Sequence, residues 1–485
     1  NVWVVQNSAG DTVTLTAGTG ANVVIPNGGI RMVATDGAGS GAAVTDVLDV
    51  LGGTGNVGLG SGAFGTGLTT GTDNVAIGEA AGDALTSGSD NTLIGDNAGG
   101  ALTTGLRNVA IGSAALLVST TANNNTMLGT SAGTAITSGA ANVGVGKDAL
   151  LSLTTGASNT AVGTVALDAV TTGNYNTAVG RDALGANTTA DNNTAVGYNA
   201  LLVNTTGSEN TALGKSALAA NTTGTENVSL GLNSLDANTT GSYNVAVGTS
   251  ALGANTTASN NTAIGTNALV ANTTGDTNVA VGANALDANT TGSSNVAVGK
   301  GALSVATTVD GNVAVGYDAL ALNTTGTGNT AVGRDALLAN TTANNNTAVG
   351  LDALTANTTA VQNTAVGSQA MITNTTGGNN VAVGMNSLFA NTTASNNTAV
   401  GYGSMENNTT GHSNVAVGYE VMKQNTTGSE NTAVGFEALD AATTADNNVA
   451  IGRLAGTGIT TGHSNTIVGA AAMQTNSTGV GNVAV

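Results

Sequence analysis

The chain lacks cysteine, has one proline and is poor in aromatic and charged side chains, at 2% and 8% of 485 residues. Without cysteine, neither disulfides nor thiolate chemistry contributes. With so few large apolar groups, an ordinary globular core could not offset the entropy of ordering the chain. No apolar run is long enough to span a membrane, and no signal peptide is visible. The net charge of −19 disfavours nucleic acid and anionic membranes as partners.

A seventeen-residue repeat fills most of the sequence. Asparagine recurs at every seventeenth residue from Asn74 to Asn482, and one more copy, with an extra residue, starts at Asn56. Positions are numbered here from this asparagine as position 0, so that the coil from Asn193 to Glu209 carries positions 0 to 16. A fixed period of this length predicts a stacked solenoid, because one repeat cannot bury its apolar face alone.

The start of each repeat has the alternation of a β-strand. Position 1 is Thr or Val and position 3 is Val, Ile or Leu in every copy, while position 2 is usually Ala. We therefore expect positions 1 and 3 on one face and a stripe of alanine on the other. Glycine at position 4, as in Gly197, predicts a corner with positive φ or a close backbone approach.

Side-chain sizes at positions 8 and 11 vary in opposite directions. Position 8 is usually Leu or Met and position 11 is usually Asn, but copies with Gly at position 8 carry Leu or Ile at position 11: Gly82 with Leu85, Gly99 with Leu102, Gly133 with Ile136 and Gly456 with Ile459. Lost volume at one position is restored at the other, so we expect both to reach one interior space.

The remaining positions suggest a second strand near positions 7–13, with turns near 5–6 and 14–16. Where position 14 is Ala instead of Gly, position 16 is Asn or Gln, as in Ala190 with Asn192, so the positive-φ residue is expected to move from 14 to 16. Asn at positions 0 and 11 and Thr at 12 and 13 should form hydrogen-bonded ladders between coils.

Residues 1–55 break the period and predict a small N-terminal β-module. Asn1–Asn7, Asp11–Ala17, Asn22–Pro26 and Gly29–Thr35 have strand character, and Ala42–Leu51 would connect them to the first coil. Residues 56–485 form the repeat shaft in this interpretation.

Two stretches resemble known families. The step Asn244–Gly248 resembles the Asn-Ser-Val-Ala-Ile-Gly motif in the heads of trimeric autotransporter adhesins. The unit Asn-Thr-Ala-Val-Gly-Tyr-x-Ala-Leu-x-x-Asn-Thr-Thr-Gly looks like arrays in phage tail-fibre and virion-appendage proteins, and residues 2–37 are similar to short tail-fibre β-modules. The period of 17 differs from the shorter adhesin repeat. The resemblance implies left-handed parallel β-rolls, three chains side by side.

Chemistry-bearing side chains gather at one position only. Catalytic, cofactor and metal motifs are not recognisable, and His412 and His463 are expected in exposed turns, so we do not expect an enzyme. Position 5 carries a candidate surface-contact stripe: Tyr198, Tyr317, Tyr402, Tyr419, Phe436, Arg181, Lys215, Lys300 and Arg334, with Lys147 and Arg453 in the same slot. Position 6 is often acidic in these copies. The stripe is interpreted either as a solvated or interchain corner or as a polyvalent ligand-binding surface.

These observations predict an all-β, parallel β-solenoid that assembles as a homotrimer. Burial of the alanine stripe between three chains would enlarge a thin core, with Arg181 and Arg334 meeting position-6 acids of a neighbouring chain. The first functional hypothesis is the shaft of a phage tail fibre, located in the virion, contacting other tail proteins on its N-terminal side and projecting a host-receptor-binding tip beyond Val485. A bacterial trimeric surface adhesin is the second. An ice- or surface-binding solenoid is the third, motivated by the threonine ladders.

Overall fold

The computed structural model describes residues 2–7, 10–16, 23–25, 29–35, 44–51 and 55–485, and every regular element among them is a β-strand. The repeats form a parallel β-solenoid with 17 residues per coil, which confirms the all-β solenoid predicted from the period. The chain divides into two compact units, Asn1–Thr240 and Gly241–Val485. Each unit is described by itself.

The first unit begins with short antiparallel strands. β1 (Val2–Gln6) pairs with β4 (Gly29–Thr35), β4 pairs with β5 (Val44–Leu51), and β2 (Val13–Leu15) pairs with β3 (Val23–Ile25). Val23, Ile25 and Val33 are buried together. The stretch expected to be a connector is therefore largely strand β5, which pairs antiparallel with the first coil strand, β6 (Asn56–Leu59). The outer ends of the other expected strands lie partly outside the described residues.

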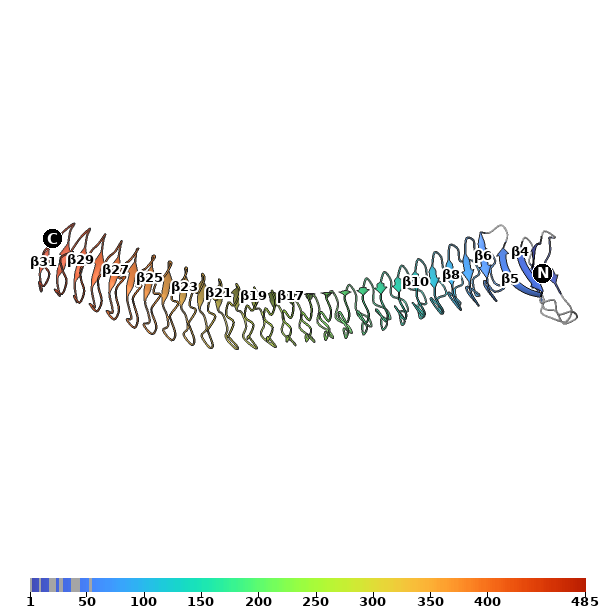
Figure 1. Ribbon diagram of the computed structural model, residues 1–485, viewed down its shortest axis with the longest axis horizontal. Coiled ribbons are helices and arrows are strands. Elements are labelled where there is room, and N and C mark those ends of the chain that lie inside the picture. Colours follow the sequence, from blue (N-terminus) through green and yellow to red (C-terminus); the bar gives the residue numbers. More distant parts are fainter. Residues whose placement is uncertain (1, 8–9, 17–22, 26–28, 36–43, 52–54) are drawn as a thin grey trace. The chain divides into compact units, whose positions relative to one another are not determined.

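The coils of the first unit continue from β6 as parallel strands in sequence order, one per coil (Figure 1). These strands are β7 (Val75–Ile77), β8 (Thr92–Ile94), β9 (Val109–Ile111), β10 (Thr126–Leu128), β11 (Val143–Val145), β12 (Thr160–Val162), β13 (Thr177–Val179), β14 (Thr194–Val196), β15 (Thr211–Leu213) and β16 (Val228–Leu230).

The second unit repeats the same arrangement without a preceding antiparallel element. Its strands are β17 (Val245–Val247), β18 (Thr262–Ile264), β19 (Val279–Val281), β20 (Val296–Val298), β21 (Val313–Val315), β22 (Thr330–Val332), β23 (Thr347–Val349), β24 (Thr364–Val366), β25 (Val381–Val383), β26 (Thr398–Val400), β27 (Val415–Val417), β28 (Thr432–Val434), β29 (Val449–Ile451), β30 (Thr466–Val468) and β31 (Val483–Ala484).

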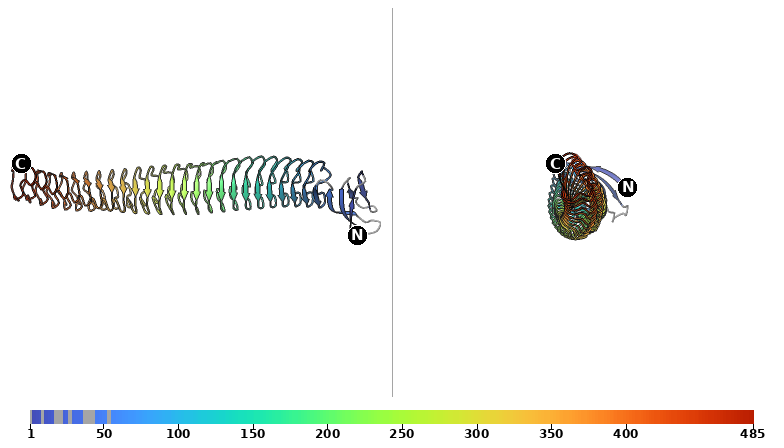
Figure 2. Two further views of the ribbon diagram at one scale, coloured as in Figure 1. Left: turned by 90° about the horizontal axis from the view of Figure 1, so that it is seen from above. Right: turned by 90° about the vertical axis from the view of Figure 1, so that its left-hand side faces the viewer.

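Within each unit, consecutive repeats pair in register. Thr160 pairs with Thr177 in the first unit and Thr330 with Thr347 in the second, and Figure 2 shows the strands of neighbouring coils stacked side by side. Each strand covers positions 1 to 3 only. The predicted second strand at positions 7–13 is wrong, because the chain there makes turns and bends. Some of its amides still donate to the following coil, as Val203 N–H does to the Ala219 carbonyl at 3.1 Å, but they form no continuous strand ladder.

The alanine stripe faces the interior of the coil, which corrects the expectation that it covers the contact between chains. Ala195 is completely buried within its own chain, as are Ala178 and Ala212. Positions 1 and 3 point outward instead, and Val179 and Leu213 keep 36% and 45% of their surface exposed. Alanine fills position 2 in most coils, and the larger Leu93 and Met127 stand there in coils whose position 8 is glycine, Gly99 and Gly133. The strands therefore turn their Thr/Val face outward.

Positions 8 and 11 share the interior, as predicted, and position 2 is a third member that was not predicted from the sequence. Leu201 and Leu102 are both fully buried. A Cβ placed on Gly99 would lie 2.8 Å from Cδ2 of Leu93, a position-2 residue of the same coil. One coil carries leucine at both 8 and 11, Leu150 and Leu153, and there position 2 is Gly144. Volume is thus balanced over three positions.

Buried asparagine columns connect the coils. At position 0, Oδ1 of Asn210 accepts the main-chain N–H of Asn227 at 3.1 Å, while its Nδ2 donates to the Gly224 carbonyl at 2.9 Å. At position 11, Asn221 Nδ2 donates to Oδ1 of Asn204 at 2.8 Å. Both predicted asparagine ladders are confirmed. Most amides of the two columns bond to both neighbouring coils, but the columns at position 11 end where the next coil has alanine, and there Oδ1 of Asn289 and of Asn425 is buried without a partner.

The threonine ladder is confirmed at position 12 only. The Thr205 hydroxyl donates to the Thr222 carbonyl, the equivalent residue of the next coil, at 3.0 Å. Position 13 threonines such as Thr206 are exposed.

Each coil closes through residues with positive φ. Gly197 at position 4 has φ of 138°, and a Cβ there would clash with the backbone of Gly214 in the next coil, so both reasons predicted for this glycine hold. Asn199, Leu201 and Glu209 at positions 6, 8 and 16 have φ of 57°, 53° and 62°. The predicted exchange of the positive-φ site is wrong, since position 16 is left-handed with Asn or with Glu.

Removal of one asparagine from the position-0 column should destabilise the neighbouring coils. Asn210→Ala leaves the buried main-chain N–H of Asn227 without its Oδ1 acceptor, at a cost of roughly 1–3 kcal/mol. It also removes one of the two donors to the Gly224 carbonyl, which keeps Asn221 Nδ2 at 2.9 Å. Thermal melting of the full chain should show the loss. Thr223→Ala, at an exposed position of the same coil, is the control, and equal melting of both variants would contradict the role of the column.

The interior balance can be tested with three variants. Gly99→Leu should cost about 1–3 kcal/mol through overpacking against Leu93. Adding Leu93→Ala should restore most of the stability, while adding Leu102→Ala should restore less, because Leu93 is the nearer neighbour. Denaturant unfolding measures each change, and a better rescue by Leu102→Ala would show that position 2 is not part of the shared space.

Candidate functional site

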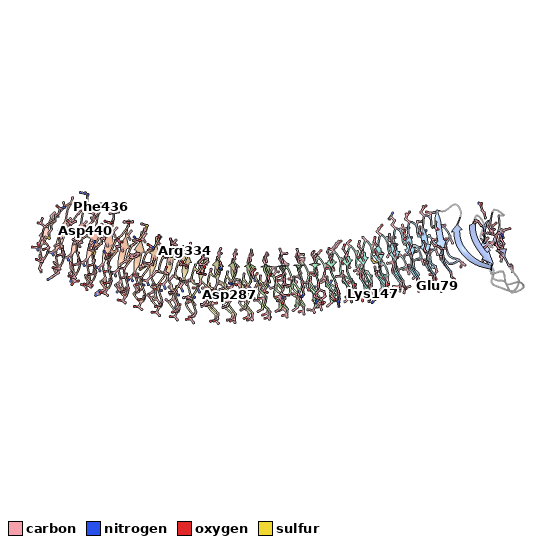
Figure 3. The ribbon with its side chains drawn as sticks, viewed as in Figure 1. Glu79, Lys147, Asp287, Arg334, Phe436 and Asp440 are labelled. Carbon is pink, nitrogen blue, oxygen red and sulfur yellow. The ribbon has the colours of Figure 1, made fainter. Side chains whose placement is uncertain are left out.

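The position-5 stripe lies on the outer surface of the coils. Position 5 follows the glycine corner that ends each strand, so its side chain leaves the coil where the backbone turns. Lys147, Arg334 and Phe436 extend outward from their coils (Figure 3). All the predicted stripe residues are exposed, with Tyr198, Tyr317 and Tyr419 at 44%, 50% and 44%.

Three aromatic residues of the stripe in the second unit are stacked. Tyr402 and Tyr419 have ring centroids 5.3 Å apart with planes 14° from parallel, and Tyr419 and Phe436 are 5.2 Å apart and 6° from parallel. We call Tyr402, Tyr419 and Phe436 the aromatic ladder. Such pairs contribute about 0.5–1.5 kcal/mol each beyond their buried area. The in-register coils bring together residues seventeen apart in sequence.

Cations of the stripe lie over neighbouring rings. The Arg181 guanidinium is 5.7 Å from the centroid of Tyr198, and Lys300 is 5.8 Å from that of Tyr317. Arg453 lies 5.7 Å from the Phe436 centroid, at one end of the aromatic ladder. At exposed positions each such contact contributes roughly 0.5–1 kcal/mol.

Position-6 acids pair with stripe cations of the same chain. Arg181 contacts Asp182 at 3.0 Å, and Arg334 contacts Asp335 at 3.2 Å and Asp352 at 3.6 Å. The acids predicted to receive Arg181 and Arg334 from another chain already have partners within their own chain. Lys215 has an exposed side chain next to Ser216 rather than an acid.

A row of acids at position 9 was not predicted from the sequence. Burial raises the pKa of Asp168, Asp236, Asp287 and Asp440 above its ordinary value. Asp440 also feels the charge of Glu437, and its buried Oδ1 has no hydrogen-bond partner. The sequence shows that these four aspartates share position 9 of the repeat. It does not show that side chains at this position are half-buried.

The remaining described surface offers little catalytic chemistry. His412 and His463 are exposed, as expected. In the part of the chain that the structure describes, no group of three or more His, Cys, Asp or Glu side chains could hold a metal ion. No helix that could cross a membrane occurs in the same part of the chain. Compared with known proteins, the chain matches no family model, no curated protein and no solved structure.

Asp440 should make the stability of the protein depend on pH. Its folded-state pKa is raised above the ordinary value of 3.8, so its contribution to stability is fully favourable below that value and is lost as the pH rises through the folded pKa. Asp440→Asn should therefore stabilise the protein at pH 7, by less than about 1 kcal/mol because the group is partly solvated. Thermal melts at pH 7 and pH 3 measure the difference, and a gain of equal size at both would exclude the charge as its cause.

Proposed function

We propose that this chain is a structural fibre shaft made of three parallel copies. The main support is the outward face of the strands, which is formed by positions 1 and 3. Positions 1 and 3 hold only Thr, Val, Ile or Leu in every copy from Asn74 onward, although the net charge of the chain is −19. Ile264 and Ile451 in the second unit keep 40% and 43% of their surface exposed. An uncharged face in which position 3 is always aliphatic and position 1 is valine or threonine favours association with another surface.

Three chains joined through this face would bury it without altering a coil. The interior of each coil is already filled and its asparagines are bonded, so association needs no rearrangement. The stripe at position 5 would then border the seam rather than form it, because position 5 follows the corner glycine at the end of the strand. The three-chain arrangement is supported by the resemblance to adhesin heads.

The shaft would serve a virion appendage such as a phage tail fibre. The antiparallel strands before the first coil would act as the N-terminal module, next to other tail proteins, and a tip beyond Val485 would meet the host receptor. A bacterial trimeric surface adhesin would use the same shaft. For the surface-binding alternative, the position-12 threonine hydroxyls are used between coils, as in Thr205 and Thr222, and those of position 13 remain exposed.

Substitutions on the strand face should break the assembly. Val162→Arg, Val179→Arg and Leu213→Arg together place cations on the proposed interface, where unpaired buried charge opposes association. The control is Val118→Arg, Val203→Arg and Val305→Arg, since these position-10 valines are 40%, 37% and 38% exposed away from the strand face.

Light scattering on the purified chain measures the outcome. We expect three times the chain mass for the unmodified chain and the control, and a lower mass for the strand-face variant. A stable monomer for the unmodified chain would overturn the shaft proposal.

A further inference from the structure

The aromatic ladder is the densest exposed aromatic feature of the second unit. Met385, which precedes it at position 5 in the adjacent coil, is 46% exposed. Tyr402 and Phe436 are 40% and 41% exposed, so the apolar strip spans four consecutive coils. Elsewhere at position 5, aromatics stand singly beside cations, as Tyr317 does beside Lys300.

The stacking decides which part of each ring is free. Both faces of Tyr419 are covered, by Tyr402 on one side and Phe436 on the other. A ligand that stacks flat on one ring, as a single pyranose does, therefore has no free face on the central tyrosine. What remains exposed is a row of ring edges that runs from coil to coil. A long, flat ligand placed lengthwise along this row would contact all three residues together.

Charge around the ladder favours a cation. Its three coils carry Glu406, Glu420, Glu430, Glu437, Asp440 and Asp446 against Lys423, and Arg453 lies in the next coil. Lys423 is shared between Glu420 at 2.7 Å and Glu406 at 3.5 Å. Glu437, directly after Phe436, makes no ion pair within the described part of the chain. Carboxylates thus outnumber cations, and one of them is available to an incoming positive charge.

We propose that the aromatic ladder binds elongated planar aromatic cations, which lie along the solenoid axis across the coils of Tyr402, Tyr419 and Phe436. The ring edges and Met385 supply apolar contact area, and the excess of carboxylates selects positive over negative ligands. This site is separate from the strand face proposed for chain association.

The test uses the full chain and thioflavin T, a flat, elongated aromatic cation, in a fluorescence titration. Tyr419→Thr removes the centre of the ladder, and position 5 already carries threonine in other coils, at Thr130 and Thr164. The matched control is Tyr317→Thr, which removes an isolated tyrosine of the same stripe. Circular dichroism and thermal melting confirm that both variants keep the fold.

We expect saturable binding to the unmodified chain and to Tyr317→Thr, and a Kd raised about tenfold or more in Tyr419→Thr, equivalent to about 1.4 kcal/mol. Glu437→Gln should raise the Kd by a smaller factor, and the anionic dye ANS should not compete. Equal affinity of Tyr419→Thr and the unmodified chain, equal losses in both tyrosine variants, or displacement by ANS would each overturn the proposal. Light scattering decides the shaft proposal independently.

Discussion

The buried asparagine at position 0 is the interaction on which each coil depends. A chain that turns several times within seventeen residues leaves main-chain groups that no strand ladder can satisfy. The side chain of Asn210 bonds the N–H of Asn227 in the next coil and, through Nδ2, the carbonyl of Gly224 at the turn before it. A buried donor or acceptor without a partner costs about 1–3 kcal/mol, so the same residue is required in every coil.

Once these groups are satisfied, the interior needs little bulk. Alanine at positions 2 and 7 and leucine at position 8 fill a thin core. The left-handed residues donate to neighbouring coils, Asn199 to the preceding one and Leu201 to the following one. Side chains of varied chemistry occur on the outer surface of the coils. The strand face stays uncharged, while position 5 carries rings and charges that contact equivalent positions of the neighbouring coils.

The period and the coil could be predicted from sequence because they follow from spacing alone. The strand at positions 1 to 3, the corner at Gly197, the asparagine columns and the shared volume of positions 8 and 11 all have visible patterns. Which face of the strand lies inside the coil could not be predicted, because alternating residues define two faces without showing which one is buried. Alanine is small enough for either a chain interface or a narrow interior, and only the width of the closed coil decides.

Positions 5 to 16 were harder to predict for a different reason. Their conformation depends on positive φ at Asn199, Leu201 and Glu209, and leucine and glutamate rarely adopt it, so the pattern suggested a strand instead. The residues of the stripe could be predicted from the sequence because they all stand at position 5 of the repeat. Their pairing within one chain, Arg181 with Asp182 and Tyr402 with Tyr419, depends on side-chain directions that only the folded coil defines.

Residue-resolved hydrogen exchange tests the central claim most directly. If the asparagine column holds the coils together, the main-chain amides of position 0, such as Asn210 and Asn227, should exchange as slowly as the strand amides of position 1, with protection recurring every seventeen residues. Rapid exchange at position 0 beside protected strands would show that the strands alone sustain the solenoid and would contradict the account.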